Sequence, residues 1–221
     1  MLSIFTSSRA DGSMKSIHSG DIETVNSARA TFLKKHNISP DDTTLVKMSY
    51  DRNDFLRYST VNNENKGDGI TKDSTIVSDG FIVTQPNYAL FLPLADCIGV
   101  VLHDPTKDIM MVSHLGRHNL EQFGGTESVT YLVRNHHVNP ENLTVWLSPA
   151  AGSDAYPLFA FDNRSLHNVA IEQLVNGGIL AKNITTSPID VTNDGNYYSH
   201  SKFLKGAQTD DGRFAIVAVM R

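Results

Sequence analysis

Residues 94–104 read LADCIGVVLHD and residues 108–119 read DIMMVSHLGRHN, and the rest of the chain is interpreted around these two stretches. Each contains an apolar run of strand character, and residues 104–107 between the runs have the Asp and Pro of a tight turn. Two strands joined by so short a turn predict an antiparallel hairpin. The hairpin would bring Cys97, just before the first strand, beside His114, at the end of the second.

A cysteine beside a histidine has a limited set of roles. A thiolate next to an imidazole is either an activated nucleophile or part of a metal site. The alternative is structural: Cys97, the only cysteine, is a small buried hydrophobic residue, and His114, one of nine histidines, is a hydrogen-bonded strand-end residue. The position at paired strand ends, with Asp96 and Gly116 alongside, favours a functional role, and Asp96 is a third candidate catalytic residue.

Composition excludes several classes of protein. The chain has 221 residues, of which 40% are hydrophobic, and a net charge of -5, so a large core is expected. No basic run resembles a nucleic-acid footprint, and no apolar stretch is long enough to span a membrane. A single cysteine fits a reducing compartment, and the first residues do not resemble a signal peptide. We therefore expect a cytoplasmic protein that binds neither nucleic acid nor a membrane, and the sequence leaves open whether it is a monomer or a homodimer.

Predicted strands and helices are interspersed without regular alternation, and neither a repeat nor a linker is evident. This arrangement predicts one mixed α/β (α+β) domain over residues 1–221, with mixed β-sheets flanked by helices. Besides the hairpin, strands are predicted over residues 43–48, 80–84, 88–92, 143–147, 183–186 and 214–220. Helices are predicted over residues 21–36 with Asp21 as N-cap, from Thr126 onward, and over 163–176.

Two segments have the composition of binding loops. Residues 51–78 are rich in Asn, Asp and Gly, and predict a long surface loop that is either a lid over the site or a plain excursion. Residues 197–202 read YYSHSK and combine aromatic with polar side chains. The small residues at 148–152 would allow close approach of a ligand, but a tight loop explains them equally well.

Familiar cofactor motifs are absent from the sequence. There is no glycine-rich phosphate loop, no dinucleotide fingerprint and no histidine pair at helical metal spacing. His136 and His137 are adjacent and would point apart on a helix. The histidines are scattered rather than clustered, which argues against a multicopper site.

Several short motifs occur in the order of a known family. Residues 95–102, ADCIGVVL, resemble its "ADC-x-P-V-L" signature, and His114-Leu115-Gly116 resembles the start of its "HAGWRG" signature. Weaker similarities lie at residues 11–13, Asn26, 79–84, 148–152 with Tyr156, 198–200 and 212–213. By this order and spacing the chain resembles the laccase-domain family, also called YfiH-like, polyphenol oxidase-like or peptidoglycan editing factor.

The resemblance implies a fold and a chemistry. It implies mixed sheets with helices, and a metal site, usually zinc, held by two histidines and the signature cysteine. It also implies action on purine nucleosides, by phosphorolysis or by deamination of adenosine. A polyphenol oxidase label and a role in correcting cell-wall precursors are attached to some members.

The sequence departs from the family pattern around the implied metal. Ser49 or Tyr50 stands where the family has its first histidine, so zinc would lack one of three protein ligands. The "WRG" of the second signature becomes residues 117–119, RHN, and His118 is a candidate replacement ligand. The closing arginine pair becomes Ser201-Lys202, and the proline after the cysteine becomes Gly99.

Three functions remain open from the sequence. The first is a purine nucleoside-processing enzyme with zinc on Cys97, His114 and His118. The second is a metal-free cysteine hydrolase or transferase in which His114 activates Cys97. The third is a non-catalytic member that binds a nucleoside or a protein. Residues predicted to bind substrate or phosphate are Ser49, Arg117, His118, Tyr198, His200, Lys202 and Arg213.

Overall fold

The hairpin lies at the centre of a six-stranded sheet in a computed structural model that describes residues 1–15, 22–51 and 53–221. Strands β6 (Ile98–Asp104) and β7 (Ile109–Leu115) pair antiparallel, with Gly99 opposite His114. The sheet order is β3-β4-β7-β6-β8-β9. The other four strands are β3 (Tyr58–Thr60), β4 (Gly80–Val83), β8 (Thr144–Leu147) and β9 (Ile184–Thr186). The predicted hairpin and its turn are confirmed.

A second sheet has four strands in the order β1-β10-β5-β2. They are β1 (Leu2–Thr6), β10 (Phe214–Met220), β5 (Tyr88–Leu94) and β2 (Thr43–Leu45). β10 is antiparallel to both neighbours, whereas β2 runs parallel to β5. In each sheet parallel and antiparallel pairs occur together, which confirms the predicted class of mixed sheets flanked by helices.

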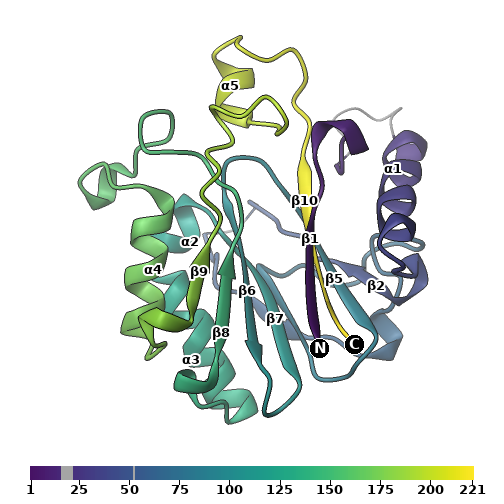
Figure 1. The fold of residues 1–221 in the computed structure, drawn as a ribbon, viewed down its shortest axis with the longest axis vertical. Coiled ribbons are helices and arrows are strands. Elements are labelled where there is room, and N and C mark those ends of the chain that lie inside the picture. The colour runs from purple at the N-terminus through teal and green to yellow at the C-terminus, as the bar shows by residue number, and fades with distance from the viewer. Residues whose placement is uncertain (16–21, 52) are drawn as a thin grey trace.

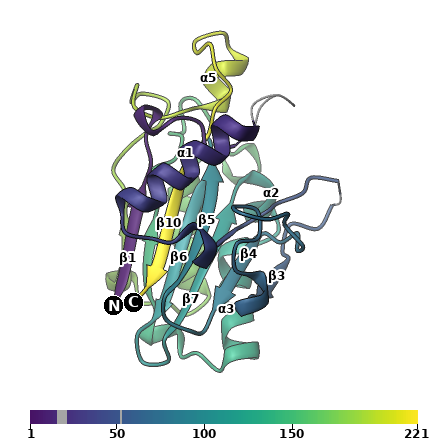
Figure 2. The same cartoon turned by 90° about the vertical axis from the view of Figure 1, so that its right-hand side faces the viewer.

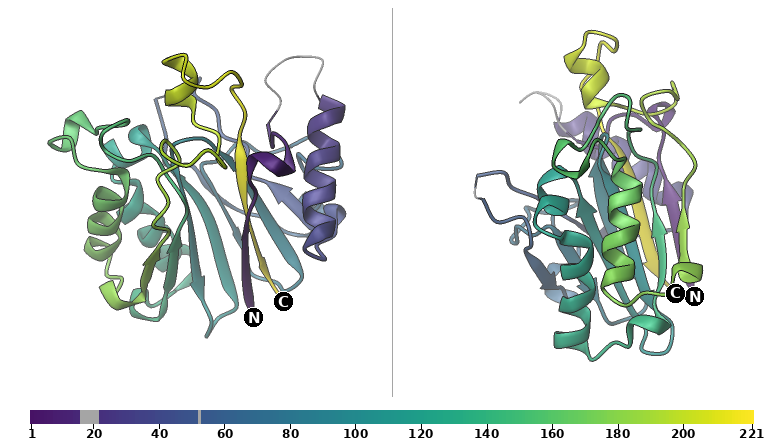
Figure 3. Two further views of the ribbon diagram at one scale, coloured as in Figure 1. Left: turned by 45° about the horizontal axis from the view of Figure 1, so that its top comes forward. Right: turned by 90° about the vertical axis from the view of Figure 1, so that its left-hand side faces the viewer.

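The two sheets pack face to face, and helices cover their outer faces (Figure 1). Helix α1 (Ile22–Lys35) lies across the four-stranded sheet (Figure 2). Helices α3 (Gly124–His136) and α4 (Leu166–Asn176) lie side by side against the six-stranded sheet, next to the short α2 (Arg117–Glu121) (Figure 3). Strands covered on both faces are apolar throughout, and β5, β6, β7 and β10 are buried along their whole length.

Strand β10 supplies two hydrophobic clusters by simple alternation of its side chains. Phe214, Ile216, Ala218 and Met220 belong to the cluster between the sheets, which continues under α3 and α4. Residues 215, 217 and 219 belong to the cluster under α1. Strand β5 alternates in the same way, so these two strands are shared between both cores.

The predicted helices form, with shifted ends and faces. In α1 the buried residues include Arg29 and Leu33, whereas Ile22, at the start of the helix, is half exposed. Asp21, the predicted N-cap, lies outside the described residues. Helix α4 begins at 166 rather than 163 because the Ser165 hydroxyl accepts a hydrogen bond from the Asn168 backbone N–H.

The prediction of an unstructured loop over residues 51–78 is wrong in part. Strand β3 lies inside this segment and pairs parallel to β4, with Tyr58 opposite Gly80. At the other polar segment, residues 197–202, a short helix α5 (His200–Leu204) forms, with the Ser199 hydroxyl as its cap. None of the helices in the described ranges is both long and apolar enough to cross a membrane.

Candidate functional site

A cavity of about 1090 Å³ opens beside the ends of β5 and β7 and the start of β6. Helix α5 lies next to the start of β10 at the same edge of the sheets (Figure 1). Eight of the residues predicted from the sequence line this cavity: Ser49, Asp96, Cys97, His114, Arg117, His118, His200 and Arg213. The cavity is large enough for a nucleoside together with a small anion.

The hairpin brings Cys97 and His114 to one spot, and Gly116 separates their side chains. A Cβ atom placed on Gly116 would lie 2.9 Å from the Cys97 Sγ and 2.8 Å from the His114 Cε1. Both side chains also line the cavity. Any side chain at position 116 would collide with the sulfur and the imidazole. Glycine at this position therefore allows the two groups to lie close together, a role that the sequence did not indicate.

The surroundings keep both groups in their neutral forms. Burial raises the pKa of the Cys97 thiol to about 12, with the Asp96 charge adding to the shift, while Arg213 and Arg117 offset part of it. Burial lowers the pKa of His114 to about 4, although Asp79 and Asn119 act in the opposite direction. A thiolate–imidazolium pair is therefore disfavoured at neutral pH.

We predict that Cys97 is a slow nucleophile. Only the thiolate reacts with iodoacetamide, so at pH 8 Cys97 should react on the order of a thousandfold more slowly than an exposed cysteine of pKa about 8.5. The matched control is the Cys97→Ser, Gly195→Cys variant, since Gly195 is exposed. A labelling rate for Cys97 equal to that of the control would contradict the prediction.

Asp96 holds the polar segment around α5 against the cavity. Its Oδ2 accepts hydrogen bonds from the backbone N–H and the hydroxyl of Ser201, each at 2.7 Å. Its backbone has a φ of 72°, a left-handed conformation that is uncommon outside glycine. The Oδ1 atom is buried and has no partner within the described ranges. The third candidate catalytic residue therefore positions α5 through the contacts of its carboxylate with Ser201.

The family-implied zinc does not fit the donors found here. Over the residues that the structure describes, no group of three or more His, Cys, Asp or Glu side chains is arranged to hold a metal ion. His118 stacks on Phe55 at 4.7 Å and its Nδ1 lies 3.7 Å from Glu121. Ser49 donates its hydroxyl hydrogen to Asp51 instead. Cys97 and His114 alone leave two protein ligands, and tetrahedral zinc sites need at least three.

Asp211 is a functional candidate that the sequence did not indicate. Its Oδ1 lies 2.7 Å from the His200 Nδ1 and 2.6 Å from the Arg213 Nη1. It lies in the segment just before β10, and both partners line the cavity. Hydrogen bonds from Arg213 and His200 outweigh the opposing effect of burial and lower the pKa of Asp211. The acidic residue is eleven positions away from His200, so no local pattern links the two.

The cavity wall carries more positive than negative side chains. Arg29 is almost fully buried, and its guanidinium donates to the backbone oxygens of Met14 and Gly69. Burial lowers its pKa to about 10. Burial, together with the charges of Arg213 and Arg29, lowers the pKa of Lys15. Tyr156, matched to the family only by a weak motif, also lines the cavity.

Two predicted substrate-binding residues lie elsewhere. Tyr198 is buried, with Arg9 stacked over its ring at 4.9 Å and Gly212 packed against it. Lys202 lines a separate, smaller hollow together with Arg9 and Tyr197. In a one-turn helix neighbouring residues point in different directions, so His200 reaches the large cavity whereas Lys202 does not.

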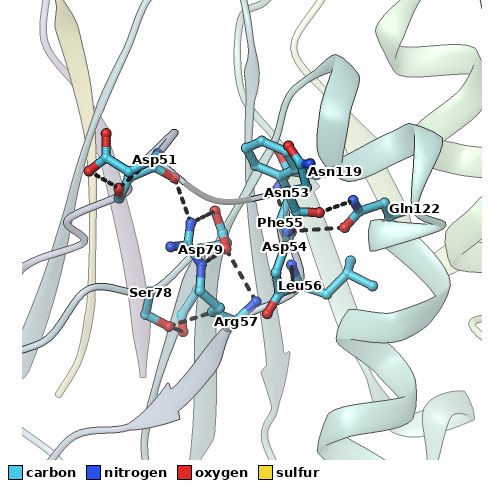
Figure 4. Close-up of polar contacts among 12 residues, drawn as sticks. Asp51, Asn53, Asp54, Phe55, Leu56, Arg57, Ser78, Asp79, Asn119 and Gln122 are labelled. Atoms are coloured by element: carbon cyan, nitrogen blue, oxygen red, sulfur yellow. Dashed lines mark hydrogen bonds and ion pairs between the residues drawn. The ribbon is translucent and has the colours of Figure 1, made fainter.

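A polar network around Arg57 and Asp79 holds the segment before β3 in place (Figure 4). Arg57 donates to Asp79 through Nε at 2.8 Å and to the Ser49 carbonyl through Nη2 at 2.7 Å. The Asp79 carbonyl accepts the His114 backbone N–H at 2.8 Å. One ion pair therefore joins the segment before β3 to the strand that carries His114.

The same segment is also tied to the helices on the far side of the network. The Gln122 side chain accepts the Phe55 N–H at 3.0 Å and donates to the Asn53 carbonyl at 2.7 Å. Asn119, at the start of α2, donates to the Phe55 carbonyl at 2.7 Å (Figure 4). Residues 53–57 are thus hydrogen-bonded at both ends. These contacts would have to break before the segment could open as a lid.

Known proteins resemble this chain in sequence and in fold. A family model described as multi-copper polyphenol oxidoreductase laccase matches residues 10–164. Purine nucleoside phosphorylase YlmD of Bacillus subtilis is 26% identical over 102 residues, which is 45% of this chain. That match spans 37% of the relative's own length.

Solved structures match over the whole chain. YfiH of Bacillus licheniformis superposes with a TM-score of 0.86 at 18% identity, covering 100% of this chain and 93% of that one. YlmD of Geobacillus stearothermophilus superposes with a TM-score of 0.84 at 17% identity, covering 100% of this chain and 92% of that one. These likenesses establish the fold. With a family model that matches more than half of its length, the chain belongs to the laccase-domain family, described as multi-copper polyphenol oxidoreductase laccase.

Proposed function

We propose that this chain cleaves purine nucleosides by phosphorolysis in the large cavity. One observation carries the proposal: a cavity of about 1090 Å³ is lined both by apolar residues, such as Met48, Pro93 and Leu94, and by an excess of positive side chains. Such a site suits a flat base and sugar beside an anion. The naming of the Bacillus subtilis relative as a purine nucleoside phosphorylase supports the same substrate class.

The charges around the cavity favour phosphate as the second substrate. The positive side chains that line the cavity are Lys15, Arg29, Lys47, Lys72, Arg117 and Arg213, and they outnumber the acidic Asp51, Asp73 and Asp96. Two of these cations are paired with carboxylates behind the lining, Lys72 with Asp68 and Arg213 with Asp211. Arg117 is half exposed, its Nε lies 4.0 Å from a Glu121 carboxylate oxygen, and its Nη2 lies 3.4 Å from the His118 Nε2. Its guanidinium is therefore available to a phosphate oxygen, as arginine side chains commonly are in anion sites.

The proposed reaction uses no metal step. A phosphate oxygen forms a bond to C1′ of the ribose while the bond from C1′ to the purine nitrogen breaks, and the electron pair leaves with the base. The products are the free base and ribose 1-phosphate. Cys97 and His114, neutral at pH 7, would shape and line the floor of the site instead of attacking the substrate.

Release of base from inosine and adenosine, followed by chromatography, tests this function. We expect free base only when phosphate is present, and ribose 1-phosphate in equal amount. Arg117→Ala should raise the KM for phosphate by about tenfold or more, since a charge-assisted hydrogen bond is lost. The matched control is Arg134→Ala, on the exposed face of α3. Base release without phosphate, or none from any nucleoside, would contradict the proposal.

The proximity of Cys97 to His114 favours a second candidate, a metal-free cysteine hydrolase. The raised thiol pKa and the lowered imidazole pKa oppose it. A Cys97→Ser variant separates the two functions, because it would abolish covalent catalysis and leave phosphorolysis largely intact. Zinc at one atom per chain, lost in Cys97→Ala, would instead restore the metal-dependent version of the family chemistry.

A further inference from the structure

His200 and Asp211 form a hydrogen-bonded pair in the wall of the cavity. The distance from Nδ1 to Oδ1 is 2.7 Å, and the side chains are 43% and 16% exposed, respectively. Within the described ranges the other ring nitrogen, Nε2, has no hydrogen-bond partner, and the residue lines the cavity. One nitrogen is therefore fixed by a carboxylate while the other is available to a ligand.

The other two cavity histidines are less suited to moving a proton. His114 is buried, its pKa is lowered to about 4, and it therefore remains neutral at physiological pH. His118 is stacked on Phe55, and no carboxylate in the described ranges lies within hydrogen-bond distance of its ring, Glu121 being 3.7 Å away. Of the three histidines that line the cavity, His200 is the one with a hydrogen-bonded carboxylate, and such a partner holds an imidazole in one orientation and tautomer.

Asp211 is itself held in the charged form. Arg213 donates to Oδ1 through Nη1 at 2.6 Å and lies 3.3 Å from Oδ2 through Nη2. A ring of Phe203, one turn along α5, lies nearly parallel to the His200 imidazole with centroids 6.4 Å apart. His200 therefore lies between the Asp211 carboxylate and the Phe203 ring, and the Arg213 guanidinium holds Asp211 from its other side.

We propose that His200, oriented by Asp211, is the catalytic acid that protonates the departing purine; this rests on the phosphorolysis proposed above. As the C1′–N9 bond breaks and its electron pair moves into the base, the proton on Nε2 passes to N7 of the purine. The attacking hydrogen phosphate then returns its own proton to Nε2 as it becomes the ribose 1-phosphate ester. Atoms and charges balance, and the imidazolium is regenerated without another reactant.

A comparison of guanosine with 7-methylguanosine tests the assignment. The methylated base is already positively charged and leaves without being protonated. His200→Gln should therefore lower kcat on guanosine by about 100-fold or more, the usual contribution of a general acid, and change kcat on 7-methylguanosine by less than about threefold. Asp211→Asn should show the same selective loss at smaller magnitude, and the KM for 7-methylguanosine should stay near the wild-type value.

The control is His137→Gln, an exposed histidine at the end of α3, which should match the wild type on both substrates. Equal losses on both substrates in His200→Gln would show a structural or binding role and overturn the assignment, as would unchanged kcat on guanosine. In either case turnover by the wild type would leave phosphorolysis standing. A wild type that cleaves neither nucleoside would overturn both proposals together.

Discussion

Asp79→Asn should lower the free energy of unfolding by about 3–5 kcal/mol, the usual cost of removing one partner from a buried ion pair. The Asp79 carboxylate is 2% exposed and binds Arg57, itself 17% exposed, through two nitrogens. In the variant the guanidinium would stay buried beside a neutral amide. Urea unfolding followed by far-UV circular dichroism measures the change from the midpoint and slope.

The matched control is Asp42→Asn, which removes the partner of Lys66. That pair is just as short, at 2.7 Å, but Asp42 is 46% exposed. We expect a change below about 1 kcal/mol, as is usual for pairs at the surface. An equal decrease in the free energy of unfolding in both variants would show that the Arg57–Asp79 pair stabilises the fold no more than a surface pair does.

Gly116→Ala should reduce kcat/KM for nucleoside cleavage by about tenfold or more, since one extra methyl group in the wall of a substrate pocket commonly has this effect. The new methyl group would lie within 3 Å of both Cys97 and His114, so at least one must move. The backbone itself accepts alanine, because φ is -94° at Gly116. The loss would therefore report on the arrangement of the two side chains and not on backbone strain.

Gly195→Ala is the control, because a Cβ atom at that position meets nothing within 4 Å. It should match the wild type in activity. A second readout for Gly116→Ala is the NMR signal of the His114 ring protons, which should shift if the ring is displaced. Wild-type activity and an unshifted ring in Gly116→Ala would show that the pocket absorbs the methyl group without consequence.

Local signals in the sequence predicted much of the central architecture. Two apolar runs around the Asp104-Pro105 turn were enough to predict β6 and β7, because turn chemistry and strand character act over a few residues. The meeting of Cys97 with His114 followed from that hairpin. The position of Gly116 next to both side chains could not be predicted, because it depends on the course of the chain after β7.

Features set by distant parts of the chain escaped prediction. Strand β3 is three residues long and polar, and it exists because β4 offers it a pairing edge. Asp211 becomes important only when the segment before β10 passes α5. Lys202 and His200 were grouped because they are close in sequence, but the turn of α5 sends them to different hollows.

Strands β5 and β10 each contribute alternate side chains to the core under α1 and to the core between the sheets. Neither core can therefore melt while the other keeps its native partners, since both depend on the same two backbones. Helix α1 and the pair α3 and α4, although on opposite outer faces, are joined in one cooperative unit. A partly folded species that retains only one of these layers would expose to water the apolar side chains that β5 and β10 present to the other, which makes it unfavourable.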